Sequence, residues 1–323
     1  MTTSRLELAN ALRVDIAFLE ACARDIQAGT VLSQFTRRKK DGSERKVTVA
    51  ADHVREPIRK LHEYLDSIAG PFHDSVYGFV KNRSIAQNAS QHLAQPAVLR
   101  IDLQGFFGSI TSSRVLEAFD HLGFDSDAAQ LAVDLTTYEG VLPTGFSTSP
   151  ILSNLAFAST DELLQDYATE RVLTYSRYAD DLVFSGRPDE GTISDVTAIV
   201  ETAGWDVNAA KTRLMRQGGK QYVTGLSVSD PLRPRIPPGV KRRMRWKLHV
   251  IEKHGYETYM FRFGGEELND HPRRLIGMAR HIAGVEPAVG GLLLRRLTLA
   301  LPDNWRFDRD DDDWMEYLHQ FGF

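Results

Sequence analysis

Residues 172–185 read VLTYSRYADDLVFS, two apolar runs rich in β-branched and aromatic residues on either side of an acidic pair, Asp180 and Asp181. Such runs predict two strands, with the acidic pair where the chain reverses. Side chains alternate along a straight strand, whereas at a tight hairpin tip both carboxylates can face one cleft. Two carboxylates on a rigid tip suit a hard cation such as Mg²⁺. The alternative is a solvated turn, and a third acid elsewhere in the chain decides between the two.

That third acid is Asp102, which follows a short apolar run at residues 97–101. An Asp at the exposed end of a strand is a natural metal ligand, although a helix N-cap or a turn is the commoner role. A sheet carrying Asp102, Asp180 and Asp181 can hold two Mg²⁺ ions roughly 3.5–4 Å apart, the arrangement used in nucleotidyl transfer. The three acids therefore favour a metal-dependent site for phosphoryl chemistry.

Five motifs resemble motifs A to E of reverse transcriptases, in order, over roughly residues 75–228. They are Asp102 with Phe106-Phe107, LPTG at 142–145 through SPILSN at 149–154, YADD at 178–181, Gly204 with Asn208 and Lys211, and VTGL at 223–226. NASQH at 88–92 and VTG at 223–225 also resemble the two signatures of retron enzymes. The chain is therefore expected to be a retron reverse transcriptase, with related bacterial antiphage reverse transcriptases as close relatives.

The resemblance implies an α+β right-hand polymerase with fingers, a palm of antiparallel sheet and packed helices, and a helical thumb. The expected divisions are an N-terminal helical region at 1–30, fingers at 31–95, a palm with interleaved fingers elements at 96–229, and a thumb with a C-terminal tail at 230–323. Hydrophobic periodicity predicts helices and a hairpin in these regions. The predicted elements are helical segments at 4–28 and 54–69, a hairpin at 33–50 that turns at KKDG (39–42), and thumb helices near 239–255, 271–283 and 288–299.

Composition is ordinary for a globular protein: 323 residues, 42% hydrophobic and 25% charged. The sequence has no run of 18 apolar residues and no basic-then-apolar leader pattern, so we expect no membrane partner. The single cysteine, Cys22, cannot form an internal disulfide and is interpreted as a small core residue. A reducing, cytoplasmic location is expected.

The net charge of −4 conceals an uneven distribution. Residues 231–250 contain seven Lys or Arg and no acid, whereas residues 303–316 contain seven Asp or Glu. The basic segment is expected to contact RNA or primer phosphates through Lys241, Arg242, Arg243 and Arg245. Its alternative is a solvated helix face. The acidic segment is interpreted as a solvated end or a contact for a basic partner.

By resemblance, Asp102 and Asp180 are the chief ligands of two Mg²⁺ ions, with Mn²⁺ as a possible substitute, and Asp181 is a weaker ligand. Lys211 would protonate the pyrophosphate leaving group or neutralise its charge; the alternative is an ordinary exposed lysine. Phe107 would pack beneath the sugar and reject a 2′-hydroxyl, which predicts a preference for deoxynucleotides. The alternative is that Phe106 and Phe107 are both core residues; we assign Phe106 to the core.

Five further residues are assigned to nucleotide binding. Gly145 lets the backbone approach the nucleotide closely, while Thr144 replaces the Gln usual in the family and puts a direct side-chain contact in doubt. Either Arg45 or Lys46 in the fingers hairpin would hold the triphosphate; a contact to template backbone is the alternative. The nucleotide-binding set is Leu103, Thr144, Gly145, Arg83 and Lys46.

The retron signatures are assigned to RNA and primer binding through Asn88, His92, Val223, Thr224 and Gly225. Taken alone, His92 would more often be a packed or capping histidine, and Gly225 a turn residue. The resemblance implies a cognate structured noncoding RNA as template and primer, deoxynucleoside triphosphates as substrates and a DNA product. It also implies 2′-hydroxyl priming, branched multicopy single-stranded DNA, and a partner effector protein in phage defence.

Three alternatives stay open. The first is another bacterial defence enzyme or a group II intron-like reverse transcriptase, which usually carries maturase and endonuclease extensions. The second is an RNA-directed RNA polymerase, which Phe107 disfavours. The third is a non-catalytic RNA-binding scaffold with a degenerate palm, which the intact acids disfavour.

Overall fold

The structure is a computed structural model that describes residues 2–38, 44–263 and 272–302. The chain divides into two compact units, Met1–Arg83 with Leu99–Leu214, and Ser84–Val98 with Met215–Phe323. None of the described helices is long and apolar enough to cross a membrane. The turn predicted at 39–42 and the acidic segment at 303–316 lie outside the described residues.

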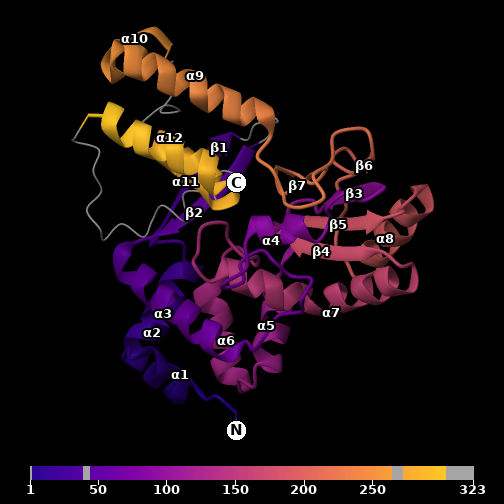
Figure 1. The fold of residues 1–323 in the computed structure, drawn as a ribbon. Helices are drawn as coiled ribbons and strands as arrows, with labels where there is room; N and C mark the ends of the chain where they lie inside the picture. The colour runs from indigo at the N-terminus through magenta and orange to yellow at the C-terminus, as the bar shows by residue number, and fades with distance from the viewer. Residues whose placement is uncertain (1, 39–43, 264–271, 303–323) are drawn as a thin grey trace. The chain divides into compact units, whose positions relative to one another are not determined.

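The first unit contains most of the helices and the two longest strands (Figure 1). Its elements are α1 (Arg5–Leu12), α2 (Ile16–Gln27), β1 (Leu32–Arg38), β2 (Glu44–Ala50), α3 (Asp52–Ile68), a 3₁₀ turn (Phe106–Ser109), α5 (Ser112–His121), α6 (Ser126–Thr136), α7 (Ser149–Glu170), β4 (Thr174–Tyr178), β5 (Asp181–Gly186) and α8 (Glu190–Thr202). Two more strands, β3 (Ala97–Asp102) and β6 (Arg213–Arg216), begin in one unit and end in the other.

The N-terminal helical region predicted at 4–28 is two helices. Ser4 and Glu7 form a capping box at the start of α1, and Arg13 ends the helix in the left-handed region at φ 53°. The side chain of Asp15 then accepts from the N–H of Phe18 and caps α2. The hydrophobic periodicity runs through both helices, so only the chain reversal between them was missed.

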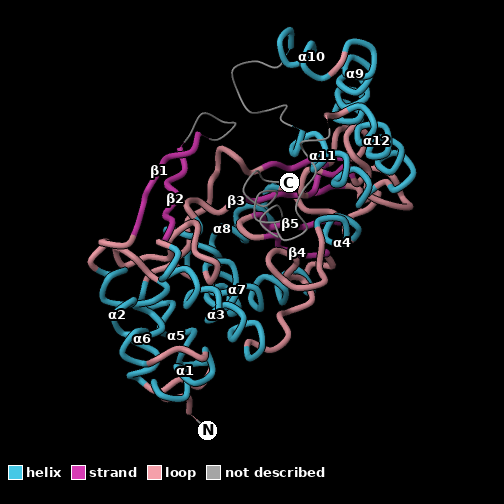
Figure 2. Tube along the Cα trace, turned by 90° about the vertical axis from the view of Figure 1, so that its left-hand side faces the viewer, coloured by secondary structure: helices cyan, strands magenta, loops and turns pink. Residues whose placement is uncertain are grey.

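Strands β1 and β2 form the predicted antiparallel hairpin, with Leu32 opposite Ala50 and Arg38 opposite Glu44. Figure 2 shows them side by side as a long two-stranded ribbon. Most of β1 is exposed, and burial increases only toward the end of β2, where Thr48 and Ala50 are buried. The hairpin therefore contributes little to the core.

The central sheet has the strand order β4-β5-β3-β6, and β4 and β5 are antiparallel. Its apolar side chains join those of α7 and α8 in one core, which includes Ile101, Phe184, Phe157, Leu164 and Val200, each at most 1% exposed. Burial of such side chains contributes about 1.5–3 kcal/mol each relative to exposure. The α+β fold class expected from the sequence is confirmed.

The second unit contains a short hairpin and four longer helices. Its elements are α4 (Ile85–Ser90), β7 (Tyr222–Val223), β8 (Leu226–Ser227), α9 (Pro238–His254), α10 (Tyr256–Phe263), α11 (Pro272–Val285) and α12 (Pro287–Ala300). Three of these helices match the predicted ones to within about three residues. Gly290 lets α11 and α12 approach closely, since a Cβ there would lie 2.0 Å from the backbone nitrogen of Ala283. The division into fingers, palm and thumb stays a prediction.

Candidate active site

The acidic pair lies at the end of the β4–β5 hairpin, as predicted. Tyr178 and Asp181 form the last cross-strand pair, so only Ala179 and Asp180 form the turn. Ala179 has φ 55°, a conformation that costs a non-glycine residue roughly 1–2 kcal/mol. Gly78 packs directly against the turn, since a Cβ there would lie 2.3 Å from the backbone nitrogen of Ala179. The tip therefore has a defined and tightly packed backbone.

Asp102 ends β3, the strand next to β5, and is 6% exposed. The N–H of Leu103 donates to the carbonyl of Asp180 at 2.9 Å, which joins the end of β3 to the hairpin tip. Burial, and then the negative charge of Asp102, raise the pKa of the Asp180 carboxyl. Two neighbouring carboxylates, one of them buried where it disfavours its own charge, are a donor set that fits a divalent cation.

Asp181 is engaged differently. The Nε of Arg100 donates to Asp181 Oδ1 at 2.9 Å, and burial raises the pKa of this carboxyl to about 6 despite that partner. Within residues 2–38, 44–263 and 272–302, no group of three or more His, Cys, Asp or Glu side chains is arranged to hold a metal ion. The structure thus brings Asp102 and Asp180 together, whereas Asp181 is held by arginine.

Lys211 lies beside the first acid. Its Nζ is 3.5 Å from Asp102 Oδ2, and its charge lowers the pKa of the Asp180 carboxyl. The segment before it is fixed to the same strand, because the N–H of Asn208 donates to the carbonyl of Asp102 at 2.8 Å. The predicted general acid therefore reaches the carboxylates.

The two adjacent phenylalanines have separate environments. Phe106 is 4% exposed and packs against Phe157 and Trp205, so its assignment to the core is confirmed. Phe107 is only partly buried, with its ring centroid 6.0 Å from that of Phe79. Phe79, at φ 60° in the segment that follows Gly78, was not identified from the sequence.

Gly145 has the structural role expected of a close backbone approach. Its φ is 121°, and a Cβ there would lie 2.4 Å from the carbonyl oxygen of Thr48 on β2. The N–H of Thr48 donates to the carbonyl of Thr144 at 2.8 Å, so residues 144–145 and the β1–β2 hairpin form one joint. The Thr144 side chain has no part in this hydrogen bond.

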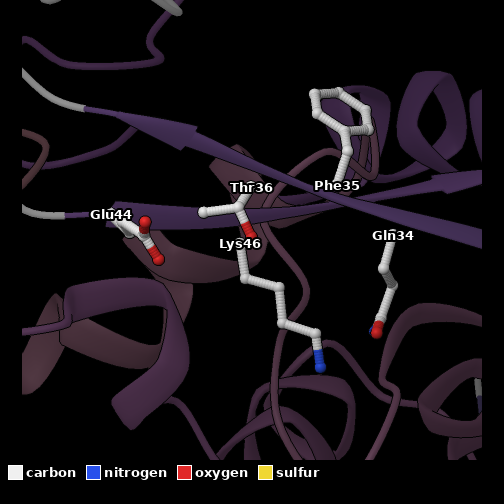
Figure 3. Close-up of a pocket in the computed structure, with 5 residues that line it drawn as sticks. All are labelled: Gln34, Phe35, Thr36, Glu44 and Lys46. Atoms are coloured by element: carbon white, nitrogen blue, oxygen red, sulfur yellow. The ribbon is translucent and has the colours of Figure 1, made fainter.

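The β1–β2 hairpin separates the two candidate triphosphate ligands. Figure 3 shows Lys46 and Gln34 extending from one face of the ribbon and Phe35 from the other. Lys46 Nζ lies 3.3 Å from Glu139 Oε2. Arg45, the neighbour that alternation places on the opposite face, lowers the pKa of the Asp180 carboxyl through its charge. Of the two cations, Arg45 is the one whose charge lowers the pKa of the Asp180 carboxyl.

Arg83, the second predicted phosphate contact, organises a loop. Its guanidinium donates to the carbonyls of Phe72, His73 and Val76 and pairs with Asp74 at 3.2 Å. This loop leads into Gly78 and the hairpin tip. The observed contacts favour a structural role for Arg83, and phosphate binding stays a prediction.

The two signature segments of the second unit pack together. Asn88, His92 and Val223 are completely buried, and burial lowers the pKa of His92 to about 3, so its imidazole is neutral. Thr224 and Gly225, at φ 46° and 78°, form the β7–β8 turn, and Thr224 Oγ1 donates to the carbonyl of Ile85 at 3.2 Å. The turn is therefore more accessible to solvent than the buried side chains, and RNA contact at either stays a prediction.

The basic residues of α9 divide into two groups. Lys241 pairs with buried Glu286 at 2.8 Å, an ion pair that fixes α9 to the start of α12. Arg242, Arg243 and Arg245 are exposed. Gly239, Arg242, Arg243 and Trp246 line a shallow hollow, and Trp246 is 47% exposed. An exposed aromatic ring among arginines was not identified from the sequence, although the spacing of Trp246 from Arg242 and Arg243 is one helical turn.

The chain is similar in sequence to known proteins over most of its length. Residues 37–250 match the family described as "Reverse transcriptase (RNA-dependent DNA polymerase)". The retron Mx162 reverse transcriptase of Myxococcus xanthus is 32% identical over 90% of this chain and 66% of its own length. The retron Ec86 reverse transcriptase of Escherichia coli is 34% identical over 59% of this chain and 60% of its own length. A telomerase of Candida albicans, solved with a fragment of telomeric RNA, aligns with a TM-score of 0.47 and 11% identity over 89% of this chain and 66% of that chain, too weakly to carry an argument.

Proposed function

Because the chain belongs to the reverse transcriptase family, we propose that it is an RNA-directed DNA polymerase acting on deoxynucleoside triphosphates. The match to the two retron relatives described above spans 66% and 60% of their own lengths. The observation that carries the proposal is the proximity of two carboxylates: Asp102 at the end of β3 lies next to Asp180 in the β4–β5 turn. Lys211 lies beside Asp102.

The family uses divalent metal ions, and the donor set of this chain fits them. Asp102 and Asp180 would hold the metal, with Asp181 as a weaker ligand; the proposed pair of Mg²⁺ ions, replaceable by Mn²⁺, would stabilise charge on the attacking and leaving oxygens. Lys211 would donate a proton to the leaving group or neutralise its charge. Arg45 would bind the triphosphate of the incoming nucleotide.

Substrate choice is assigned to the surroundings of the acids. Phe107, supported by Phe79, would lie beneath the sugar and select deoxynucleotides. Leu103 and residues 144–145 would form the backbone platform for the nucleotide. The carbonyl of Thr144 also accepts a hydrogen bond from the N–H of Thr48, so the proposed platform is fixed to β2.

The template is proposed to be a cognate structured noncoding RNA. The exposed arginines of α9, the ring of Trp246 and the Thr224–Gly225 turn supply the phosphate contacts and the stacking surface that RNA binding needs. Branched multicopy single-stranded DNA, an effector protein, antiphage defence and a cytoplasmic location belong to the same proposal and come from the resemblance to retron enzymes. Sequencing the nucleic acid that copurifies with the protein tests this part: a short DNA joined to one RNA species supports it, and RNA without DNA when nucleotides are present contradicts it.

The polymerase activity itself is tested by primer extension on an RNA template. Asp102→Asn and Asp180→Asn should each reduce the rate about 10³-fold or more, since each removes a charge from the proposed metal site. Asp166→Asn, an exposed acid on α7, is the matched control and should leave the rate unchanged. If both variants make DNA at the wild-type rate, the assignment of these acids to the metal site is wrong. If wild type makes no DNA and both variants keep the biological activity, the protein acts as an RNA-binding scaffold.

A further inference from the structure

A buried charged group lies under the acidic turn, and the proposed chemistry gives it no role. Arg177 on β4 and Asp161 on α7 are 0% and 1% exposed. Nε of Arg177 donates to Asp161 Oδ1 at 2.8 Å and Nη2 to Oδ2 at 2.6 Å, a bidentate pair. Tyr175 donates its hydroxyl to Asp161 Oδ1 at 2.8 Å, and Arg177 Nη1 donates to Asn154 Oδ1 at 3.0 Å. We call Arg177, Asp161, Asn154 and Tyr175 the Arg177 cluster.

The Arg177 cluster is joined to both sides of the turn. Arg177 Nη1 also donates to the carbonyl of Ala179, at 3.2 Å. Asn154 Nδ2 donates to the carbonyl of Gly78 at 2.9 Å, and the N–H of Tyr77 donates to the carbonyl of Arg177 at 2.8 Å. The cluster thus holds the peptide before Asp180 and also the glycine that packs against it.

The chemistry of the cluster argues for a geometric role. A buried ion pair seldom stabilises a fold more than apolar side chains of the same volume would, so stability alone does not explain its presence. A left-handed alanine persists only where the surroundings hold it, and the Arg177 guanidinium contacts that residue's carbonyl. Burial opposes the charge of Arg177, but Asp161 raises its pKa, so the guanidinium stays charged and its five N–H groups stay available.

We propose that Arg177, Asp161 and Asn154 are positioning residues that hold the Ala179–Asp180 turn and thereby aim the carboxylates of Asp180 and Asp181. This inference rests on the proposed function, because it assigns those carboxylates to metal binding. Partners that orient metal ligands without touching the metal typically change metal affinity or activity about 10–100-fold when they are removed.

The test compares Asn154→Leu and Arg177→Lys with Thr160→Val, a matched control. Thr160 lies on the same helix, is buried, and accepts one hydrogen bond, from Trp205 Nε1 at 3.0 Å, without contacting the turn. Arg177→Lys keeps the charge but loses the bidentate fork. The melting temperature of each variant is measured first. Below the lowest of these temperatures, kcat and KM for DNA synthesis are measured, together with the Mn²⁺ affinity of the RNA-bound protein by electron paramagnetic resonance.

We expect kcat to fall about 10–100-fold in Asn154→Leu and Arg177→Lys, with a similar loss of Mn²⁺ affinity and little change in KM for RNA. Thr160→Val should lower the melting temperature while leaving kcat and Mn²⁺ affinity within about twofold of wild type. If the three variants match in kcat and Mn²⁺ affinity, the cluster only stabilises the fold and the inference is wrong. If wild type makes no DNA, the proposed function fails separately, and the Mn²⁺ titration still decides whether the cluster orders the turn.

Discussion

The two hairpins of the first unit differ in how their strands are held. The β4–β5 hairpin reverses in two residues, has a buried strand centre, and rests on an ion pair with a hydrogen bond to the turn itself. The β1–β2 hairpin is an exposed two-stranded ribbon that is held by an exposed ion pair, Lys46 with Glu139, and by the hydrogen bond between Thr48 and Thr144. The difference shows that the carboxylates lie on a tightly packed backbone, whereas the cationic side chains of Arg45 and Lys46 lie on a largely exposed one.

The largest effect is expected when the Arg177–Asp161 ion pair that supports the β4–β5 hairpin is broken. Asp161→Asn leaves Arg177 buried without a carboxylate and should lower the free energy of unfolding by about 3–5 kcal/mol, measured by urea denaturation. The double variant Asp161→Leu with Arg177→Met should recover much of that stability, because apolar side chains then replace the pair, yet DNA synthesis should stay low. Recovery of both would show that the pair has no positioning role.

The close packing at the tip gives the next effect. Gly78→Ala places a Cβ 2.3 Å from the backbone nitrogen of Ala179, which should cost about 1–3 kcal/mol of stability and reduce DNA synthesis. Gly108→Ala is the control for stability, since a Cβ there meets no atom within 4 Å and the glycine is not left-handed. Equal melting temperatures for the two variants would contradict the tight packing.

The second unit offers a further comparison, because α4, which packs against the short β7–β8 hairpin, is followed by a buried, neutral histidine. Burial lowers the pKa of His92 to about 3, so as the pH falls the imidazole is protonated in the unfolded chain before it is protonated in the folded one. The stability that the neutral His92 contributes is therefore present above about pH 6.5 and is lost as the pH falls below that value. Between pH 7.5 and 5.5 this group alone should cost about 1.4 kcal/mol. Urea denaturation at both pH values should show that His92→Gln loses less free energy of unfolding than wild type, by that amount. The same pH dependence in the two proteins would contradict the buried neutral imidazole.

The smallest effects are expected in the exposed β1–β2 hairpin, where they distinguish the side chains on its two faces. Arg45→Ala should raise KM for the nucleotide roughly 10-fold with little change in stability, since a charge-assisted contact is lost. Lys46→Ala, on the opposite face, should change stability by at most about 1 kcal/mol and leave KM near wild type, because its ion pair with Glu139 is exposed. A KM effect at Lys46 alone would reverse the assignment of the faces.

Several elements were predictable because the signal is local. The apolar runs around YADD and the periodicity of residues 239–299 predicted strands and helices that the structure contains. The ordered motifs predicted a reverse transcriptase with retron relatives, and this is confirmed. Asp102 and Asp180 lie close together because Asp102 ends β3 and Asp180 lies in the turn before β5, the neighbouring strand of the same sheet.

Other features depend on which face of an element meets a distant segment. Strand alternation places Arg45 and Lys46 on opposite faces but does not indicate which of the two side chains lies near the carboxylates. Asp161 is 16 residues from Arg177 along the chain, and a charge inside the buried run TYSRY was the only signal that a partner existed. Asn88 and His92 were assigned to RNA, yet their side chains are fully buried, and RNA contact through them stays a prediction.

The complete burial of the Arg177–Asp161 pair has a consequence for ionic strength. Counterions screen exposed charges over about 8–10 Å of solution but do not reach a pair that water does not touch. The exposed arginines of α9, in contrast, would release RNA as salt rises. Added salt should therefore weaken RNA binding, while the acidic turn keeps its geometry. A saturating concentration of RNA should then restore the maximal rate of DNA synthesis.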